Sequence, residues 1–279
     1  MIKSTFFVEV ILSILLFIGY FVFFFLRYRK KPGFLSTILW GIGGFFVANA
    51  IYNVVLIAIT SLMGEEALVK ILENSFIMPV LITTFALAVG AVFSATFVTR
   101  MQKKRANYVE GYTDEATGFM VGAGLIAPPF GQSAAMINAS LMYFVQMFVN
   151  GFVINQNPPL EELGPDVTQE MWNELVASFT SIQVFDLFYL ALVTVVMALS
   201  YVILFKLLVR VFDKKPAWFK YGVPLMLMWS FMFLVSLVSG LDIASFIKLL
   251  LTLGFGGLLY YANRIIDARG VSVEVIDPQ

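Results

Sequence analysis

Long apolar runs alternate with short polar and basic segments along the whole chain. Most runs have the ~20 residues that an α-helix needs to cross a hydrocarbon core of roughly 30 Å. We expect an all-α, polytopic transmembrane helix bundle of about seven spans, forming a single integral membrane domain over residues 1–279. The expected spans cover residues 6–26, 34–62, 76–99, 117–153, 182–204, 223–239 and 243–262.

The fourth run differs from the others in its length and its residues. It is too long for a plain span, it opens with acidic residues, and it contains Gly122 and Gly124 followed by Pro128 and Pro129. Proline removes a helical hydrogen bond, and a break at membrane depth needs protein or a wet cavity around the freed carbonyls. We therefore expect span four to cross once, kinked or broken at the two prolines.

Basic residues predict the orientation of the bundle. If span four crosses once, fifteen of the 18 Lys and Arg residues lie after spans one, three, five and seven. The positive-inside rule then places the N-terminus outside and the C-terminus in the cytoplasm. Two crossings at the prolines would put the basic residues of 206–220 outside, which the rule disfavours. We expect a multi-pass protein of a bacterial cytoplasmic membrane.

The composition excludes several kinds of chemistry. The chain is 60% hydrophobic and 13% charged, and it contains neither His nor Cys. A thiolate metal site, a Cys nucleophile and the usual general base near neutral pH are therefore absent, and we expect no metal and no cofactor. The formal net charge is zero, so no basic field attracts nucleic acid. The expected partners are the lipid bilayer and another membrane protein.

The polar segment at residues 155–181 carries a helical pattern of its own. Trp172, Leu175, Val176 and Phe179 recur at helical spacing between polar residues. We expect an amphipathic helix on the outer membrane surface, with its aromatic residue at headgroup depth. A docking surface for a partner is the alternative.

Four ionisable residues are expected at similar depth near the outer ends of the spans: Glu9, Asp186, Asp242 and Lys248. Charges at membrane depth are costly and therefore suggest a function. An ion pair of Lys248 with one of the three acids is geometrically possible. The alternative is that each side chain reaches the headgroup region independently.

The fourth run also supplies a candidate groove for a ligand or partner. Its residues are Gly122, Gly124, Pro128, Pro129, Gln132, Asn138, Gln146 and Asn150. Asn138, Gln146 and Asn150 share one helical face because they are multiples of four apart. Amides on such a face either join membrane helices or line a substrate path.

Small residues in two other spans predict close contacts between helices. They are Gly90, Ala91, Ser94 and Ala95 in the third span, and Gly254, Gly256 and Gly257 in the seventh.

Two segments of the chain carry basic turns, acidic residues and glycine-rich helices in an order that resembles a known family. KKPGFLSTILWGIGGFFVANAIYNVVL follows a basic turn, and RMQKKRANYVEGYTDEATGFMVGAGLIAPPFG joins a basic turn to acids and a glycine-rich helix. With spans FDLFYLALVTVVMALSYVILF and WFKYGVPLMLMWSFMFL, they resemble the YhfC-type family of bacterial multi-pass membrane proteins. That family is grouped with proposed glutamate-dependent intramembrane proteases related to the CAAX prenyl proteases.

The chain departs from this family where the family has catalytic residues. The family's third helix has a Glu-Arg motif, whereas residues 85–95 contain neither residue. Its Gly-x-Gly is followed by His and Glu, whereas this chain has LIAPP. Phe188, Tyr189 and Trp229 stand about where histidines are expected. The resemblance therefore implies a relative without catalysis, to which no catalytic residue can be assigned.

Three hypotheses follow. The first is a non-catalytic protein on an intramembrane-protease-like scaffold that binds a membrane protein partner or a lipid-like ligand. The second is a small transporter or permease subunit, because transport sites often contain a broken span with buried amides. The third is an active intramembrane protease, which the missing His and Glu disfavour.

Overall fold

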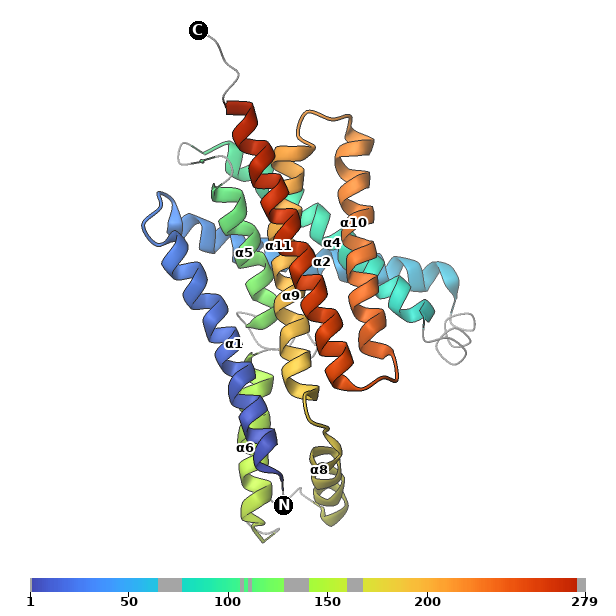
Figure 1. Ribbon diagram of the computed structural model, residues 1–279. Helices are drawn as coiled ribbons and strands as arrows, with labels where there is room; N and C mark the ends of the chain where they lie inside the picture. Colours follow the sequence, from blue (N-terminus) through green and yellow to red (C-terminus); the bar gives the residue numbers. More distant parts are fainter. Residues whose placement is uncertain are drawn as a thin grey trace.

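The computed structural model describes residues 2–64, 77–105, 108–109, 112–127, 141–159 and 168–274, with side chains up to residue 268. All regular elements in these ranges are helices, which confirms the predicted all-α bundle (Figure 1). In chain order they are α1 (Ser4–Tyr28), α2 (Phe34–Met63), α4 (Ile77–Lys103), α5 (Tyr112–Ile126), α6 (Leu141–Gln156), α8 (Gln169–Ser181), α9 (Asp186–Lys206), the π-helical turn η1 (Leu207–Val211), α10 (Ala217–Gly240) and α11 (Ser245–Glu274).

Six helices of the described part are long and apolar enough to cross a membrane. They are α1, α2, α4, α9 together with η1, α10 and α11. The chain is therefore a multi-pass helical membrane protein. α1 begins at the lower end of the bundle in Figure 1 and α11 finishes at the upper end.

In the fourth expected span, residues 117–153, the described part contains two helices, α5 and α6. α5 has 15 residues and α6 has 16, so each rises roughly 23 Å and is too short to cross the core alone. α5 lies in the upper half of Figure 1 and α6 in the lower half. The predicted break at Pro128 and Pro129 lies outside the described residues.

Aromatic side chains hold α1 against both α5 and α6. The ring of Phe17 lies 5.3 Å from that of Phe144 in α6. Tyr20 stacks on Phe119 of α5 at 4.1 Å, and its hydroxyl donates to the Phe119 carbonyl oxygen at 2.8 Å. Because one straight helix contacts both of them, α1 aligns α5 and α6.

α5 is buried along almost its whole length, between α2 and α9. A β-carbon on Gly122 would collide with the backbone of Ala198 in α9, and one on Gly124 would collide with the ring of Phe45 in α2. Glycine at these two positions lets the helices approach closely. Both glycines, which were expected to line a groove, pack against neighbouring helices at these positions.

α2 and α4 form a second closely packed pair, which runs obliquely across the bundle in Figure 1. Gly90 of α4 faces the carbonyl oxygen of Ala48 in α2. The hydroxyl of Ser94 donates to the carbonyl oxygen of Gly44 at 2.5 Å. The close contact predicted from the small residues of the third span is confirmed.

α11 lies on the outside of the bundle, and almost none of its apolar segment is buried. Nothing lies within 4 Å of a β-carbon placed on Gly254 or Gly257. A β-carbon on Gly256, the third glycine of this set, would lie 3.5 Å from Val196 of α9, which is an ordinary contact distance. The close helix contact predicted for these glycines is therefore absent among the described residues.

α8 confirms the amphipathic helix predicted at residues 168–179. The hydroxyl of Thr168 caps it by accepting the N–H of Met171 at 3.2 Å. Trp172 and Phe179 are buried, and the ring of Phe179 lies 5.5 Å from that of Phe6 in α1. The apolar face expected at headgroup depth thus packs on the protein, because α1 presents aromatic side chains to it.

The two ends of the bundle differ in charge. The end at which α1, α4, η1 and α11 finish holds the basic clusters, and we call it the basic end. The opposite end, where α1, α9 and α11 begin, holds Glu9 and Asp186, and we call it the amino-terminal end.

Candidate functional site

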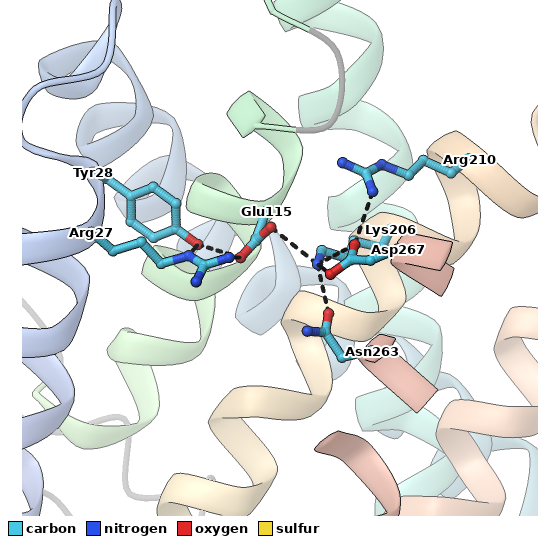
Figure 2. Close-up of polar contacts among 7 residues, drawn as sticks. All are labelled: Arg27, Tyr28, Glu115, Lys206, Arg210, Asn263 and Asp267. Atoms are coloured by element: carbon cyan, nitrogen blue, oxygen red, sulfur yellow. Dashed lines mark hydrogen bonds and ion pairs between the residues drawn. The ribbon is translucent and has the colours of Figure 1, made fainter. Parts of the chain in front are cut away.

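Lys206, the last residue of α9, is the centre of a cluster of charged side chains at the basic end (Figure 2). Its side chain has no exposed surface. Its Nζ donates to Asn263 Oδ1 at 2.6 Å and to Asp267 Oδ1 at 2.9 Å, and it lies 3.0 Å from Glu115 Oε2. Three side chains from α5 and α11 therefore match the three protons of the ammonium group.

Glu115 extends this cluster to α1. Its Oε1 accepts the hydroxyl proton of Tyr28 at 2.6 Å and lies 2.8 Å from the guanidinium of Arg27. The Nε of Arg27 also donates to the Tyr28 hydroxyl oxygen at 3.1 Å. Glu115 thus joins a fully buried cation on α9 to a half-exposed cation on α1.

Asp267 completes the cluster by binding two cations. Its Oδ1 accepts from Lys206 and from Arg210, each at 2.9 Å. Arg210 lies in η1, four residues after Lys206, so both side chains reach α11 from one side of the helix. Lys206 is the fully buried member of the cluster, so its charge depends on these oxygen partners. We call these residues the Lys206 clamp, which joins α1, α5, α9 and α11.

Sequence reasoning treated Lys206 and Arg210 only as basic residues that indicate topology. A signal was present, because Asn263 and Asp267 are four residues apart on one face of the last helix. Both bind Lys206, which precedes Asn263 by 57 positions and Asp267 by 61 positions in the chain. The pairing therefore depends on how α9 and α11 pack.

A smaller charge cluster lies beside the clamp at the basic end. Asp213, in the link between η1 and α10, accepts from Lys220 at 2.5 Å and from Lys103 of α4 at 3.3 Å. Burial raises the pKa of Asp213, but the two ammonium groups lower it, and the net result lies below the ordinary value for aspartate. This cluster ties α4 to the beginning of α10.

At the amino-terminal end, Asp186 and Asp242 have different surroundings. Asp186 Oδ2 accepts the N–H of Gln183 at 2.8 Å, and its Oδ1 accepts the hydroxyl of Ser245. Asp242 is exposed in the link between α10 and α11. Asp186 therefore ties the beginning of α9 to the beginning of α11.

Lys248 contacts neither of these acids as an ion pair. Its Nζ donates to the Ser239 carbonyl oxygen at 3.1 Å and lies 6.0 Å from the centre of the Tyr189 ring. Within the described residues, the ion pairs do not include Lys248. This geometry favours the alternative in which the charged residues of this end act independently.

Glu9 of α1 lies in the wall of a cavity at the amino-terminal end. The cavity has a volume of about 310 Å³ and lies between the first turns of α1 and residues 179–184. Glu9 is buried, and its Oε1 accepts the backbone N–H of Phe185 at 2.8 Å. Polar and apolar side chains share the wall: Ile2, Lys3, Thr5, Phe6, Glu9, Phe179, Thr180, Ser181, Ile182, Gln183 and Val184.

The groove expected in the fourth run is not assembled by the described residues. Gly122 and Gly124 are packing positions, as shown above. Gln146 is exposed on α6 and Asn150 is half-buried, while Phe144 lies on the face of α6 that packs inward. The other members, Pro128, Pro129, Gln132 and Asn138, lie outside the described residues.

No protein-family model, curated protein or solved structure matches this chain. The described part contains no group of three or more His, Cys, Asp or Glu side chains that could hold a metal ion. Tyr189 and Trp229, where the family resemblance would place histidines, bind the Ser239 hydroxyl at 2.6 Å and the Leu81 carbonyl oxygen at 3.3 Å. Both of these hydrogen bonds are contacts between helices. The described side chains as a whole can hold helices together and bind a ligand.

Proposed function

We propose that this chain is a non-catalytic multi-pass membrane protein that binds a lipid-like ligand or a membrane partner at its amino-terminal end. The observation that supports this proposal is the contrast between the two ends. At the basic end, the ammonium of Lys206 is saturated by protein oxygens. At the amino-terminal end, a cavity of about 310 Å³ has Glu9 in its wall.

The cavity wall suits a molecule with a polar head and an apolar body. Phe6, Phe179 and Ile182 provide apolar surface, while Thr180 and Gln183 provide polar groups. Its volume is at the lower end of the range of about 300–1,000 Å³ for small-molecule pockets. A headgroup with the first part of an acyl chain fits such a space, whereas a whole lipid does not.

The proposal treats the chain as a YhfC-like relative that has kept the scaffold and lost the chemistry. The absence of His from the sequence supports this, because intramembrane Ser-His and His-metal chemistry both need that residue. We expect the purified protein to leave a membrane peptide intact. Cleavage of such a peptide by the purified chain would instead favour the active protease.

A small transporter is the second candidate, and the series of two short helices, α5 and α6, favours it. Broken helices often bind substrate at the midplane of transporters. In this case, proteoliposomes containing the protein would move a solute, and Gln146→Leu would abolish the movement. The exposed position of Gln146 on α6 makes the binding protein the better-supported proposal.

The binding function can be tested by purifying the full chain in a mild detergent and identifying retained molecules by native mass spectrometry. We expect one lipid-like molecule or partner at a stoichiometric amount. Ser181→Phe should displace it by filling the cavity. Ser178→Phe is the matched control, because Ser178 is exposed on the same helix and does not line the cavity. Equal retention by both variants would contradict binding in this cavity.

A further inference from the structure

The cavity at the amino-terminal end has one carboxylate in its wall, that of Glu9. Glu9 is 7% exposed, and its Oε1 accepts the N–H of Phe185 at 2.8 Å. Its Oε2 is buried and has no hydrogen-bond partner among the described residues. Buried polar atoms in folded proteins are nearly always paired. Glu9 lines the cavity, and an unpaired oxygen on this side chain therefore points to a group that a ligand supplies.

The backbone that holds Glu9 is strained. Phe185 has a φ of 77°, in the left-handed region that a bulky side chain rarely adopts. Its N–H is bound by Glu9, and the N–H of Gln183 is bound by Asp186 at 2.8 Å. Strain of this kind persists where the surrounding structure holds a functional site in shape. The segment before α9 thus fixes one oxygen of Glu9, and the described residues supply no partner for the other.

The charges around the cavity limit the chemistry of the ligand. Lys3 is the other charged side chain in the wall; it is exposed and makes no ion pair with Glu9 in the described part of the chain. A buried carboxylate favours a cation that donates hydrogen bonds. A primary ammonium group has three N–H donors, whereas a trimethylammonium group has none.

We infer that this cavity binds the primary ammonium group of an amphiphile, with Glu9 as its carboxylate partner. The inference rests on the proposed binding function and names its ligand class. Lys3, at the exposed rim, is placed to meet an anionic group next to the ammonium. Phe6 and Phe179 cover the apolar part of the ligand. An ethanolamine phospholipid carries all three features, and a soluble alkylammonium carries the ammonium and the apolar body.

The test places the full chain in nanodiscs with equal amounts of ethanolamine and choline phospholipids that share the same acyl chains. Native mass spectrometry then measures which lipid remains bound. We expect about a ten-fold preference for the ethanolamine lipid, the factor that one charge-assisted hydrogen bond supplies. Glu9→Gln should reduce this preference to near one. The Gln side-chain oxygen can still accept the N–H of Phe185, so the variant keeps the contact that holds the fold.

Asp242→Asn is the matched control, because it removes an exposed carboxylate from the same end of the bundle. It should keep the preference of the unmodified chain. An unchanged preference in Glu9→Gln, or equal binding of both lipids by the unmodified chain, would overturn the inference.

Octylammonium distinguishes the two sources of the ammonium group. If a headgroup is bound, the ethanolamine lipid remains bound in the presence of octylammonium, and Lys3→Gln weakens its binding several-fold. If a soluble amine is bound, octylammonium displaces the lipid from the unmodified chain but not from Glu9→Gln. Either result supports the ammonium site.

The same variants separate this inference from the proposed function. A ligand that Ser181→Phe displaces and Glu9→Gln retains would leave the binding function standing and exclude the ammonium site. An unmodified chain that retains no ligand in native mass spectrometry would contradict both proposals.

Discussion

Lys206 of α9 and Asp267 of α11 are 61 positions apart in the chain, and their charged groups lie 2.9 Å apart at the basic end. This pair holds α11 to the bundle, although the apolar segment of α11 is almost entirely exposed. A peripheral membrane helix gains little from hydrophobic contacts with its neighbours, because lipid is equally apolar. The Lys206–Asp267 pair at one end and the Asp186–Ser245 contact at the other therefore both contribute to the attachment of α11.

Replacing Lys206 by Met should lower the free energy of unfolding by about 1–3 kcal/mol, because Glu115 and Asp267 lose the buried cation that they share but keep Arg27 and Arg210 as partners. Denaturation followed by circular dichroism in detergent micelles measures this change. Lys248→Met is the control, and it should cost less than about 1 kcal/mol since Lys248 forms none of the ion pairs in the described part. An equal loss of unfolding free energy in the two variants would show that the Lys206 clamp stabilises the fold no more than the contacts of Lys248 do.

Gly122→Ala should destabilise the protein by about 1–3 kcal/mol, because the new β-carbon collides with the backbone of Ala198. Gly257→Ala, on the open side of α11, should be neutral or stabilise by up to about 1 kcal/mol, because alanine favours a helix over glycine. Thermal melting of the two variants in one detergent compares them directly. A stable Gly122→Ala would mean that α5 and α9 do not approach as closely as described.

The stability of the basic end should depend on pH through Asp213. Its pKa is lower in the folded chain than in the unfolded chain, because the attraction of Lys220 and Lys103 exceeds the opposing effect of burial. The stabilisation is therefore complete above the unfolded pKa of about 4 and is lost as pH falls through the lower, folded pKa. Since the side chain is 38% exposed, we expect at most about 1 kcal/mol. Melting temperatures across this range should fall less for Asp213→Asn than for the unmodified chain.

The absence of Cys from the chain allows a direct test of orientation. We propose that the basic end faces the cytoplasm, following the positive-inside rule. A membrane-impermeant maleimide added to intact cells should label Lys3→Cys and Asp242→Cys. It should label Lys30→Cys and Lys215→Cys only after the cells are opened. The reverse pattern would place the basic end outside.

Much of the fold could be predicted because membrane spans depend on local sequence. The length of an apolar run and the charges at its ends suffice to predict a crossing, which is why the ranges of α1, α4 and α9 lie close to the expected spans. The amphipathic pattern of Trp172 and Phe179 likewise predicted α8. Its position could not be predicted in the same way, because Phe6, which packs on Phe179, belongs to a distant part of the chain.

The contacts of the candidate site could not be predicted from local sequence patterns. Glu9 was recognised as a costly charge at membrane depth, but Lys248 was considered as its partner, whereas its contact is the backbone of Phe185. A backbone N–H carries no sequence signature, so this contact could not be read from residue types. In the same way, Gly122 and Gly124 were expected to line a groove, and only the packing of α5 showed that Ala198 and Phe45 fill the adjacent space.

The sequence by itself determined that this protein is a bundle of helices in a membrane, with its basic residues gathered toward one side. That follows from apolar length and local charge, which need no knowledge of neighbours. The tertiary structure alone decided that Lys206 is saturated by Glu115, Asn263 and Asp267, and that Glu9 retains an unpaired oxygen beside a cavity. The physical reason is that the cost of a buried charge depends on the groups brought within about 3 Å of it, and the packing of distant helices supplies those groups.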